Sequence, residues 1–315
     1  MNERLDLTTT LVEVAHYYYE EDLSQQEIAD RLNVSRSLIA LYIKKARDQG
    51  IVRIEIVDPK NNLRGIGARL QQKYGLHHAS VVPSAHNSLT LTRRALGNAA
   101  ARFVDEILRD GDVFGLGWGR TMMELANLMA PARPKRIDVI PLQGESSYTG
   151  SFTQLNQVVL QVARAYSGTP YFLLVPILVG TRSLRDALLQ DAVAIPVVER
   201  WENLSVACVG IGSVPPAEGQ IVYIGEENIS KLIKADTIGD ICARYFDRQG
   251  RFINAEHNDR IISVSLSQLH KARHVVAVAG GAEKASAVVG ALRTHLISDL
   301  FVDESLAQVL LMETN

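Results

Sequence analysis

LSQQEIADRLNVSRSLIALYIKKARDQGIVRIEIV, residues 23–57, reads as a helix, a tight turn, a second helix and a short strand. Ser24 is a favourable N-cap, and Glu27 completes a capping box at the start of the first helix. Asn33 breaks that helix, and Ser35 caps the next one. Because the turn is only a few residues long, the two helices must cross steeply around shared apolar side chains. This is the helix-turn-helix geometry, in which the second helix lies in the DNA major groove.

The charges around this motif are segregated. The second helix carries only basic charge from Arg36 to Arg47, whereas residues 20–22 are all acidic. Because phosphate neutralisation supplies most sequence-independent DNA affinity, we expect a DNA reader rather than a helical hairpin with a solvated basic face. The residues expected on bases or phosphates lie at the helix starts and along the second helix: Gln25, Gln26, Ser35, Arg36, Ser37, Lys44, Lys45 and Arg47.

Length and composition describe a globular protein of about two domains, with 315 residues, 47% of them hydrophobic. The formal net charge is -2, so DNA affinity must come from a local patch, doubled by oligomerisation. Cys208 and Cys242 lack metal-ligand spacing, and Cys208 lies in an apolar run typical of a core, so we expect no metal, no cofactor and a cytoplasmic location. No signal peptide and no membrane-spanning segment are expected.

Three parts follow from the pattern along the chain. Residues 1–58 form the helix-turn-helix domain, with a first helix over Leu7–Tyr19 and a half-buried strand after Gly50. Residues 59–78 contain a linker helix over Leu63–Tyr74, which either dimerises and transmits a rotation or packs onto its own domain. Residues 79–315 form the third part, and the polar run from Asp58 to Asn62 is the clearest boundary.

In the third part, short apolar runs alternate with amphipathic helices, which predicts a mostly parallel sheet covered on both faces. The expected strands are Ala79–Val82, Asp112–Gly117, Ile137–Leu142, Tyr171–Val175, Leu204–Gly210, Val275–Ala279 and Leu300–Val302. The expected helices are Leu91–Leu108, Thr121–Met129, Gln154–Tyr166, Leu184–Trp201 and Lys284–Leu292. In such α/β sheets ligands bind where the carboxyl ends of the strands meet helix N-termini.

Loops with groups suited to ligand binding follow three of these strands. Gly115–Thr121 and Ala279–Lys284 each lead through glycines into a helix, where backbone amides and a basic side chain can hold an anion. Gln143–Gly150 is rich in groups that hydrogen-bond a polyhydroxylated ligand. A glycine-rich turn alone is weak evidence, because any tight strand-to-helix connection can require glycine.

These features together resemble the SorC family of sugar-responsive bacterial transcriptional regulators, over nearly the whole chain. The segments that carry the resemblance are LSQQEIADRLNVSRS, KKARDQGIV, GLGWGRTM, VACVGIGS, GDICARYFDRQG and AVAGGAEKASAVVGAL, in this order. The resemblance implies a Rossmann-like effector domain similar to sugar-phosphate isomerases and glucosamine-phosphate deaminases, and a homo-oligomer, dimer or tetramer. It further implies that a sugar, polyol or sugar-phosphate effector changes the affinity for a palindromic double-stranded operator.

Carried over by residue, the effector pocket would be lined by Gly119, Arg120, Thr121, Gln143, Gly144, Asp240 and Lys284. Two departures stand out. Family recognition helices often carry Ser-Arg where this chain has Ala40-Leu41, which suggests an altered operator or a shifted register. Phosphate-binding members tend to have a basic second loop, whereas here Gln143 and Glu145 flank Gly144, which leaves free and phosphorylated effectors both open.

Two other classes of protein are compatible with parts of this sequence. An enzyme of the isomerase or deaminase type would use Asp240, Glu145 or His257 as general acid or base, but the histidines show no catalytic spacing. An architectural DNA-binding protein without a ligand has no need of a large α/β domain with three glycine-bearing loops. We therefore expect a regulator without enzymatic activity.

Overall fold

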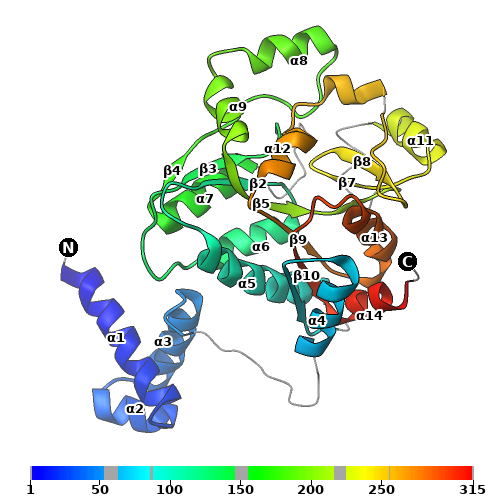
Figure 1. Ribbon diagram of the computed structural model, residues 1–315. Helices are drawn as coiled ribbons and strands as arrows, with labels where there is room; N and C mark the ends of the chain where they lie inside the picture. Colours follow the sequence, from blue (N-terminus) through cyan, green and yellow to red (C-terminus); the bar gives the residue numbers. More distant parts are fainter. Residues whose placement is uncertain are drawn as a thin grey trace. The chain divides into compact units, whose positions relative to one another are not determined.

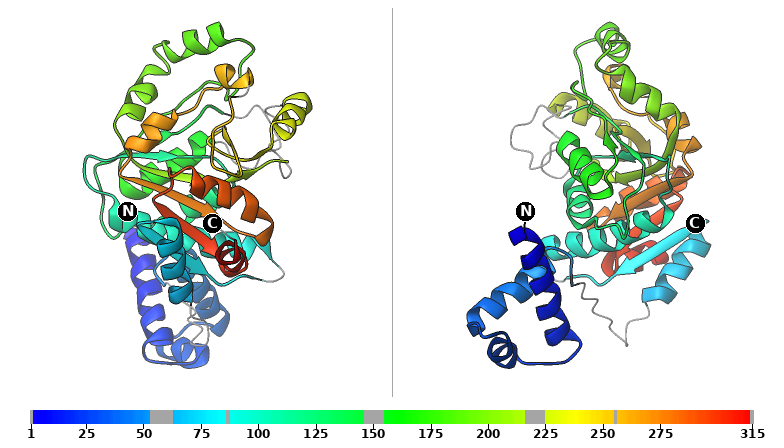
Figure 2. Two further views of the ribbon diagram at one scale, coloured as in Figure 1. Left: turned by 45° about the vertical axis from the view of Figure 1, so that its right-hand side comes forward. Right: turned by 90° about the vertical axis from the view of Figure 1, so that its left-hand side faces the viewer.

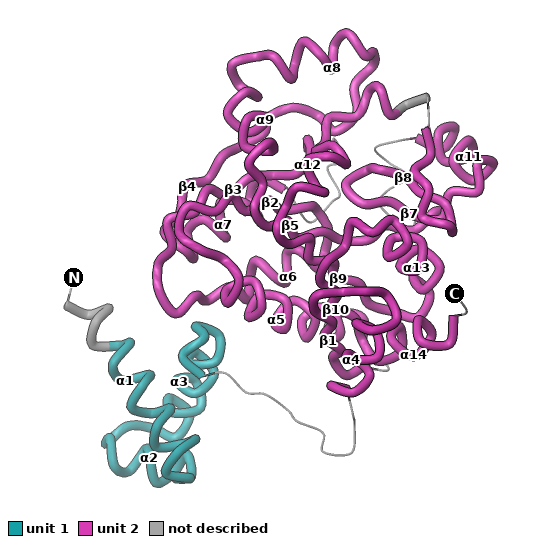
Figure 3. The backbone as a smooth tube through the Cα atoms, viewed as in Figure 1, with its two compact units in different colours: residues 1–61 teal, residues 62–315 magenta. Residues whose placement is uncertain are grey.

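The computed structural model describes residues 2–52, 63–85, 88–145, 155–215, 225–254 and 256–313. The chain divides into two compact units, Met1–Asn61 and Asn62–Asn315 (Figure 3). Most of the strand expected after Gly50, the polar run 58–62 and most of the expected 143–150 loop lie outside the described residues.

The smaller unit is a helix-turn-helix, made of α1 (Asn2–Tyr19), α2 (Gln25–Leu32) and α3 (Arg36–Asp48). The predicted caps are confirmed: Ser24 Oγ accepts the Glu27 N–H, the Glu27 carboxylate accepts the Ser24 N–H at 2.8 Å, and Ser35 caps α3. Asn33 ends α2 in the left-handed conformation, with a φ of 54°. Residues from all three helices form the core, which consists of Leu11, Val14, Ala15, Ile28, Ala29, Ile39, Ile43 and Ala46.

The larger unit is built on a parallel sheet of strand order β1-β10-β9-β5-β2-β3-β4 (Figure 1). The strands are β1 (His78–Val82), β2 (Val113–Leu116), β3 (Asp138–Pro141), β4 (Thr169–Pro170), β5 (Leu204–Gly210), β9 (His274–Ala279) and β10 (Asp299–Asp303). The central strands are buried on both faces, which explains their uninterrupted apolar runs. The predicted parallel α/β sheet is therefore confirmed.

Helices cover both faces of this sheet (Figures 1 and 2). One layer holds α5 (Leu89–Ile107), α6 (Arg120–Leu128) and α7 (Leu155–Tyr166). The other holds α4 (Leu63–Tyr74), α9 (Ile195–Glu202), α12 (Leu266–Lys271), α13 (Ala285–Arg293) and α14 (Glu304–Met312). Within this layer α4 packs onto its own unit, because Lys73 Nζ donates to Leu310 O at 3.0 Å and Tyr74 Oη donates to the same oxygen at 2.8 Å.

Two predicted elements were wrong in extent. The strand expected over Tyr171–Val175 is not observed; the strand at this edge is Thr169–Pro170, and beyond it the Asn156 side chain bonds the N–H and C=O of Leu173 as a neighbouring strand would. The single helix expected over Leu184–Trp201 is two, α8 (Arg182–Leu189) and α9. Pro196 explains the break, since proline is tolerated in the first turn of a helix but not in its interior.

A small antiparallel sheet was not predicted. It contains β6 (Gly212–Ser213), β7 (Thr237–Ile241) and β8 (Arg244–Asp247), and α11 (Glu226–Lys234) packs beside it. The β7–β8 turn places Cys242 and Ala243 at φ values of 50° and 59°. Tight hairpins of this kind usually use Asn-Gly, so no turn signal marks this hairpin in the sequence.

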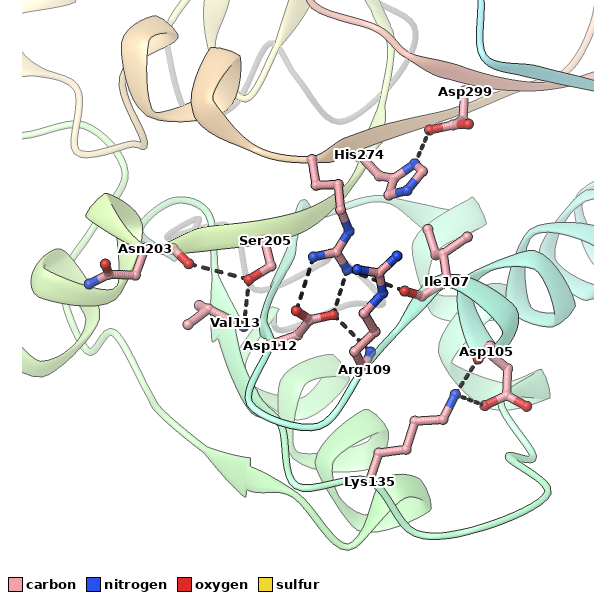
Figure 4. Close-up of polar contacts among 11 residues, drawn as sticks. Asp105, Ile107, Arg109, Asp112, Val113, Lys135, Asn203, Ser205, His274 and Asp299 are labelled. Carbon is pink, nitrogen blue, oxygen red and sulfur yellow. Dashed lines mark hydrogen bonds and ion pairs between the residues drawn. The ribbon is translucent and has the colours of Figure 1, made fainter.

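At the amino-terminal edge of the large sheet, charged side chains are paired (Figure 4). Arg273 donates to both carboxylate oxygens of Asp112, at 2.7 and 3.2 Å, and the Arg109 N–H donates to the same carboxylate at 2.8 Å. Burial works against the Asp112 carboxylate, but these hydrogen bonds outweigh it and lower the pKa of Asp112. His274 Nδ1 lies 2.9 Å from Asp299 Oδ2 at the same edge.

Candidate functional site

The DNA-reading surface predicted from the sequence corresponds to the exposed side of α3. Ile39, Ile43 and Ala46 face the core of the smaller unit, and Leu38, Tyr42 and Lys45 are half-buried, so the exposed positions lie on the opposite side of the helix. Of the expected DNA-binding residues on this helix, Lys45 is half-buried and the others are exposed, namely Arg36, Ser37, Lys44 and Arg47.

The other expected contacts lie at the helix starts. Gln25 is half-buried at the first position of α2, and Gln26 donates to Asp30 Oδ1 at 2.8 Å. Ser35 Oγ accepts the Leu38 N–H and lies 3.0 Å from Ser37 Oγ. The Ser35 side chain is thus occupied by capping, while its exposed position leaves it beside the outward face of α3.

In the larger unit, the loops that follow β2, β5 and β9 meet at the carboxyl edge of the sheet, because β5 lies between β2 and β9. The Gly117 N–H donates to Cys208 O at 2.8 Å, which joins the first loop to β5. Lys284 Nζ, from the loop after β9, donates to Ile211 O at 2.9 Å. The predicted first and third loops are therefore brought to one place.

Asp240 joins this edge from the small sheet. It pairs with Gly212, the residue after Ile211, and its carboxylate accepts the Ala243 N–H at 3.0 Å. Burial lowers the pKa of Lys284, and the negative charge of Asp240 partly opposes that shift. A half-buried lysine thus lies within electrostatic range of a buried carboxylate, which is 4% exposed.

The first loop adds backbone amides and a second cation. Gly119 is the N-cap residue of α6 with a φ of 135°, and no side chain there caps the helix. Arg120 is exposed and Thr121 half-buried in the first turn that follows. The electrostatic interaction between Arg120 and Lys284 lowers the pKa of Lys284 further, after burial and the influence of Arg93.

Arg93 on α5 was missed by the sequence reasoning. Gly97 lets α5 approach α6 closely, since a Cβ there would lie 2.8 Å from the Leu125 nitrogen. Burial lowers the pKa of Arg93, and the charge of Arg120 lowers it further. The sequence contains only a weak signal for Arg93: the first turn of α5 has no acidic residue, and the same is true of α6 and α13.

Gln143 is buried, with 1% of its surface exposed, and its Oε1 accepts no hydrogen bond from the described residues. It pairs with Ser263, whose hydroxyl donates to Cys242 O at 2.6 Å, so the second loop adjoins the turn that follows Asp240. Gly144 has a packing requirement of its own, because a Cβ there would lie 2.7 Å from the Pro176 carbonyl.

Glu145 serves as an anchor for α7. Its carboxylate accepts the N–H groups of Leu155 at 3.1 Å and Asn156 at 2.8 Å, at the start of that helix. The side chain of His257 lies outside the described residues. Among the residues that the structure describes, no His, Cys, Asp or Glu cluster could hold a metal ion, and no helix has the length and apolarity to cross a bilayer.

A family model described as "Putative sugar-binding domain" matches residues 58–312, and one described as "Putative helix-turn-helix protein, YlxM / p13 like" matches residues 4–54. Together with the two observed units, these matches define a DNA-binding transcriptional regulator with a sugar-binding domain.

Known regulators are similar to this chain over nearly its whole length. The chain is 31% identical over 301 residues to the deoxyribonucleoside regulator of Bacillus subtilis (strain 168), with 95% of this chain and 96% of that protein covered. It is 30% identical over 313 residues to the sorbitol operon regulator of Klebsiella pneumoniae, with 98% and 99% covered. The crystal structure of the full-length sorbitol operon regulator SorC from Klebsiella pneumoniae matches with a TM-score of 0.81 and 29% identity, covering 99% of both chains. The chain belongs to the SorC family of transcriptional regulators.

Proposed function

We propose that a small sugar, polyol or sugar phosphate binds at the carboxyl edge of the large sheet and controls operator binding by α3. The observation that carries this proposal is the half-buried Lys284 side chain, whose ammonium donates to Ile211 O within electrostatic range of the buried Asp240 carboxylate. Removing a charged group from water costs free energy, and sites that bind polar ligands are places where proteins keep such groups despite that cost. The proposed lining residues are Gly119, Arg120, Thr121, Gln143, Gly144, Asp240 and Lys284, with Arg93 added by the structure.

The residues at this edge suit two chemically different parts of a ligand, its hydroxyl groups and an anionic group. Asp240 accepts hydrogen bonds from sugar hydroxyls, and Gln143 Oε1, which has no partner among the described residues, accepts another. Lys284 and Arg120, with Arg93 nearby, favour an anionic group such as a phosphate, which the amides at the start of α6 also favour.

Contacts lead from this edge to α4, the helix that follows the reader in the chain. The Gly281 N–H donates to Asp303 Oδ1 at 2.8 Å, and Asp303 is the N-cap residue of α14. The other end of α14 accepts hydrogen bonds from Lys73 and Tyr74 of α4. An effector that binds one arrangement of these elements more tightly shifts operator affinity by its differential binding free energy.

The reader is proposed to bind palindromic double-stranded DNA as a homo-oligomer in the cytoplasm, through the eight residues named for it above. A regulator without enzymatic activity is consistent with the names of its relatives.

A thermal-shift screen of the purified protein against sugars, polyols and their phosphates tests the proposal, followed by operator binding with each hit. Asp240→Asn keeps an oxygen for the Ala243 N–H but removes the charge, so it should weaken a hit at least tenfold without unfolding the protein. If no compound stabilises the protein, or if Asp240→Asn binds each hit as well as the unaltered protein does, the effector site is assigned wrongly.

A further inference from the structure

Leu41 lies at the centre of the outward face of α3. It is 45% exposed, whereas Ile39 and Ile43 on either side of it in the chain are 0% and 3% exposed. At about 100° per residue, a helical position two residues from each of two buried ones points away from both. Ser37 and Lys44 lie on the same exposed row, one turn before and one turn after Leu41.

A single exposed leucine is ordinary on a protein surface, but the surroundings of this one are specific. The exposed cations Arg36, Lys44 and Arg47 lie on the same helix, so the surface around Leu41 is positive. A second copy of α3 docked on this row would bring like charges together, whereas nucleic acid brings phosphates of the opposite sign. The charge therefore favours DNA over another copy of the chain as the occupant of this face.

Leucine has no donor or acceptor, so it cannot read the hydrogen-bonding edge of a base. In the major groove the apolar group that distinguishes one base pair from the others is the C5-methyl of thymine. We propose that Leu41 contacts a thymine methyl group in each half-site and makes that thymine a determinant of operator choice. This inference rests on the proposed binding of a two-half-site operator by α3.

The test begins with the full-length protein and a library of random duplexes, from which bound sequences are selected. In the selected duplex, each thymine is then replaced singly by uracil, which removes only the methyl group. We expect one thymine per half-site whose replacement weakens binding about fourfold, from the transfer free energy of one buried methyl group, and about fifteenfold when both half-sites are replaced. Leu41→Ala should bind the thymine and uracil duplexes almost equally at that position.

Two variants serve as controls. Val34→Ala removes an exposed apolar side chain of the reader outside α3, 37% exposed, and should keep the full preference for thymine. Lys44→Ala should weaken binding to thymine and uracil duplexes by the same factor and reduce the salt dependence.

The outcomes separate this inference from the function on which it rests. If no duplex is enriched, DNA reading by α3 itself fails. If a duplex is bound but uracil replaces every thymine without loss, or if Leu41→Ala keeps the same preference as the unaltered protein, the methyl contact is refuted. A lower mass of Leu41→Ala in sedimentation, with the preference unchanged, would place Leu41 in a contact between copies and overturn the proposal as well.

Discussion

Replacing Lys284 with methionine should separate effector binding from folding. Lys284 is the N-cap residue of α13, where a positive charge meets the positive end of the helix dipole. Its pKa is lowered, first by burial. A lysine with a lowered pKa in the folded state destabilises that state in full below the folded-state pKa, and the penalty fades as the pH rises towards the value of about 10.4 in the unfolded chain.

The size of each effect can be worked out from these contacts. Lys284→Met loses one hydrogen bond to Ile211 O but relieves a desolvation cost of similar size, so the free energy of unfolding should change by less than about 1 kcal/mol. For a unit of this length that is a Tm change of roughly 2–4 °C at most. A hydrogen bond from a charged donor to the effector is worth ~1.5–3 kcal/mol, so the variant should bind the effector roughly 10–150-fold more weakly.

A thermal-shift experiment measures both the change in stability and the loss of effector affinity. At a hundredfold excess over its Kd, an effector stabilises the unaltered protein by about 2.7 kcal/mol, or roughly 5–10 °C. The same concentration should raise the Tm of Lys284→Met by only about 1–3 °C for a fiftyfold loss of affinity. Lys271→Met, an exposed lysine in a surface ion pair with Glu202, is the matched control and should keep the full shift.

Equal effector-induced shifts in Lys284→Met and the unaltered protein would show that Lys284 does not touch the effector. A fall of more than about 6 °C in the absence of effector would show that its bond to Ile211 O is structural and that the desolvation argument is wrong.

The remaining predictions concern stability. Asp112→Asn should lower the free energy of unfolding by ~2–4 kcal/mol in denaturant titration, whereas Asp259→Asn, in an exposed pair with Arg182, should change it by less than ~0.5 kcal/mol. Because the pKa of Asp112 is lowered in the folded state, the ionised Asp112 carboxylate should stabilise the protein above about pH 4, and this stabilisation should disappear as the pH falls through the folded-state pKa. If the unaltered protein and Asp112→Asn gave identical acid unfolding curves, this prediction would be wrong. Gly67→Ala should lower the Tm although alanine favours helices, because the new Cβ would lie 2.6 Å from Ala79 O. A rise in Tm would show that the backbone of β1 can move to accept the Cβ. Ser24→Ala should speed amide exchange at the start of α2 about fivefold, from the loss of ~1 kcal/mol of capping; unchanged exchange would mean that the cap contributes nothing.

Elements with a clear period could be predicted from the sequence. The capping residues located α2 and α3, and the apolar runs located the buried central strands, because both signals are local. Prediction failed where a distant side chain replaced a backbone partner, as Asn156 does beside β4, and where a hairpin turned through Cys242 and Ala243 without glycine. Neither arrangement produces a recognisable pattern in the adjacent residues of the sequence.

The same distinction applies to the candidate effector site. Strand order was needed to bring the loops after β2 and β9 together, and only the close approach of α5 to α6 revealed Arg93. The family resemblance supplied Asp240, which lies on a strand that the hydrophobic pattern did not predict.

The charged side chains at the two edges of the large sheet are paired differently, and this difference supports the effector site proposed at the carboxyl edge. At the amino-terminal edge, Asp112 meets Arg273 and Asp299 meets His274, so both carboxylates have a basic partner, although Arg273 Nε and Asp299 Oδ1 make no hydrogen bond with the described residues. At the carboxyl edge, Lys284 and Arg120 stand at helix N-termini, and Gln143 buries an acceptor without a donor among the described residues. Each of these placements lowers the stability of the protein without ligand. Because a ligand with hydroxyls and a negative charge relieves all three at once, their coincidence at one edge points to binding rather than to folding.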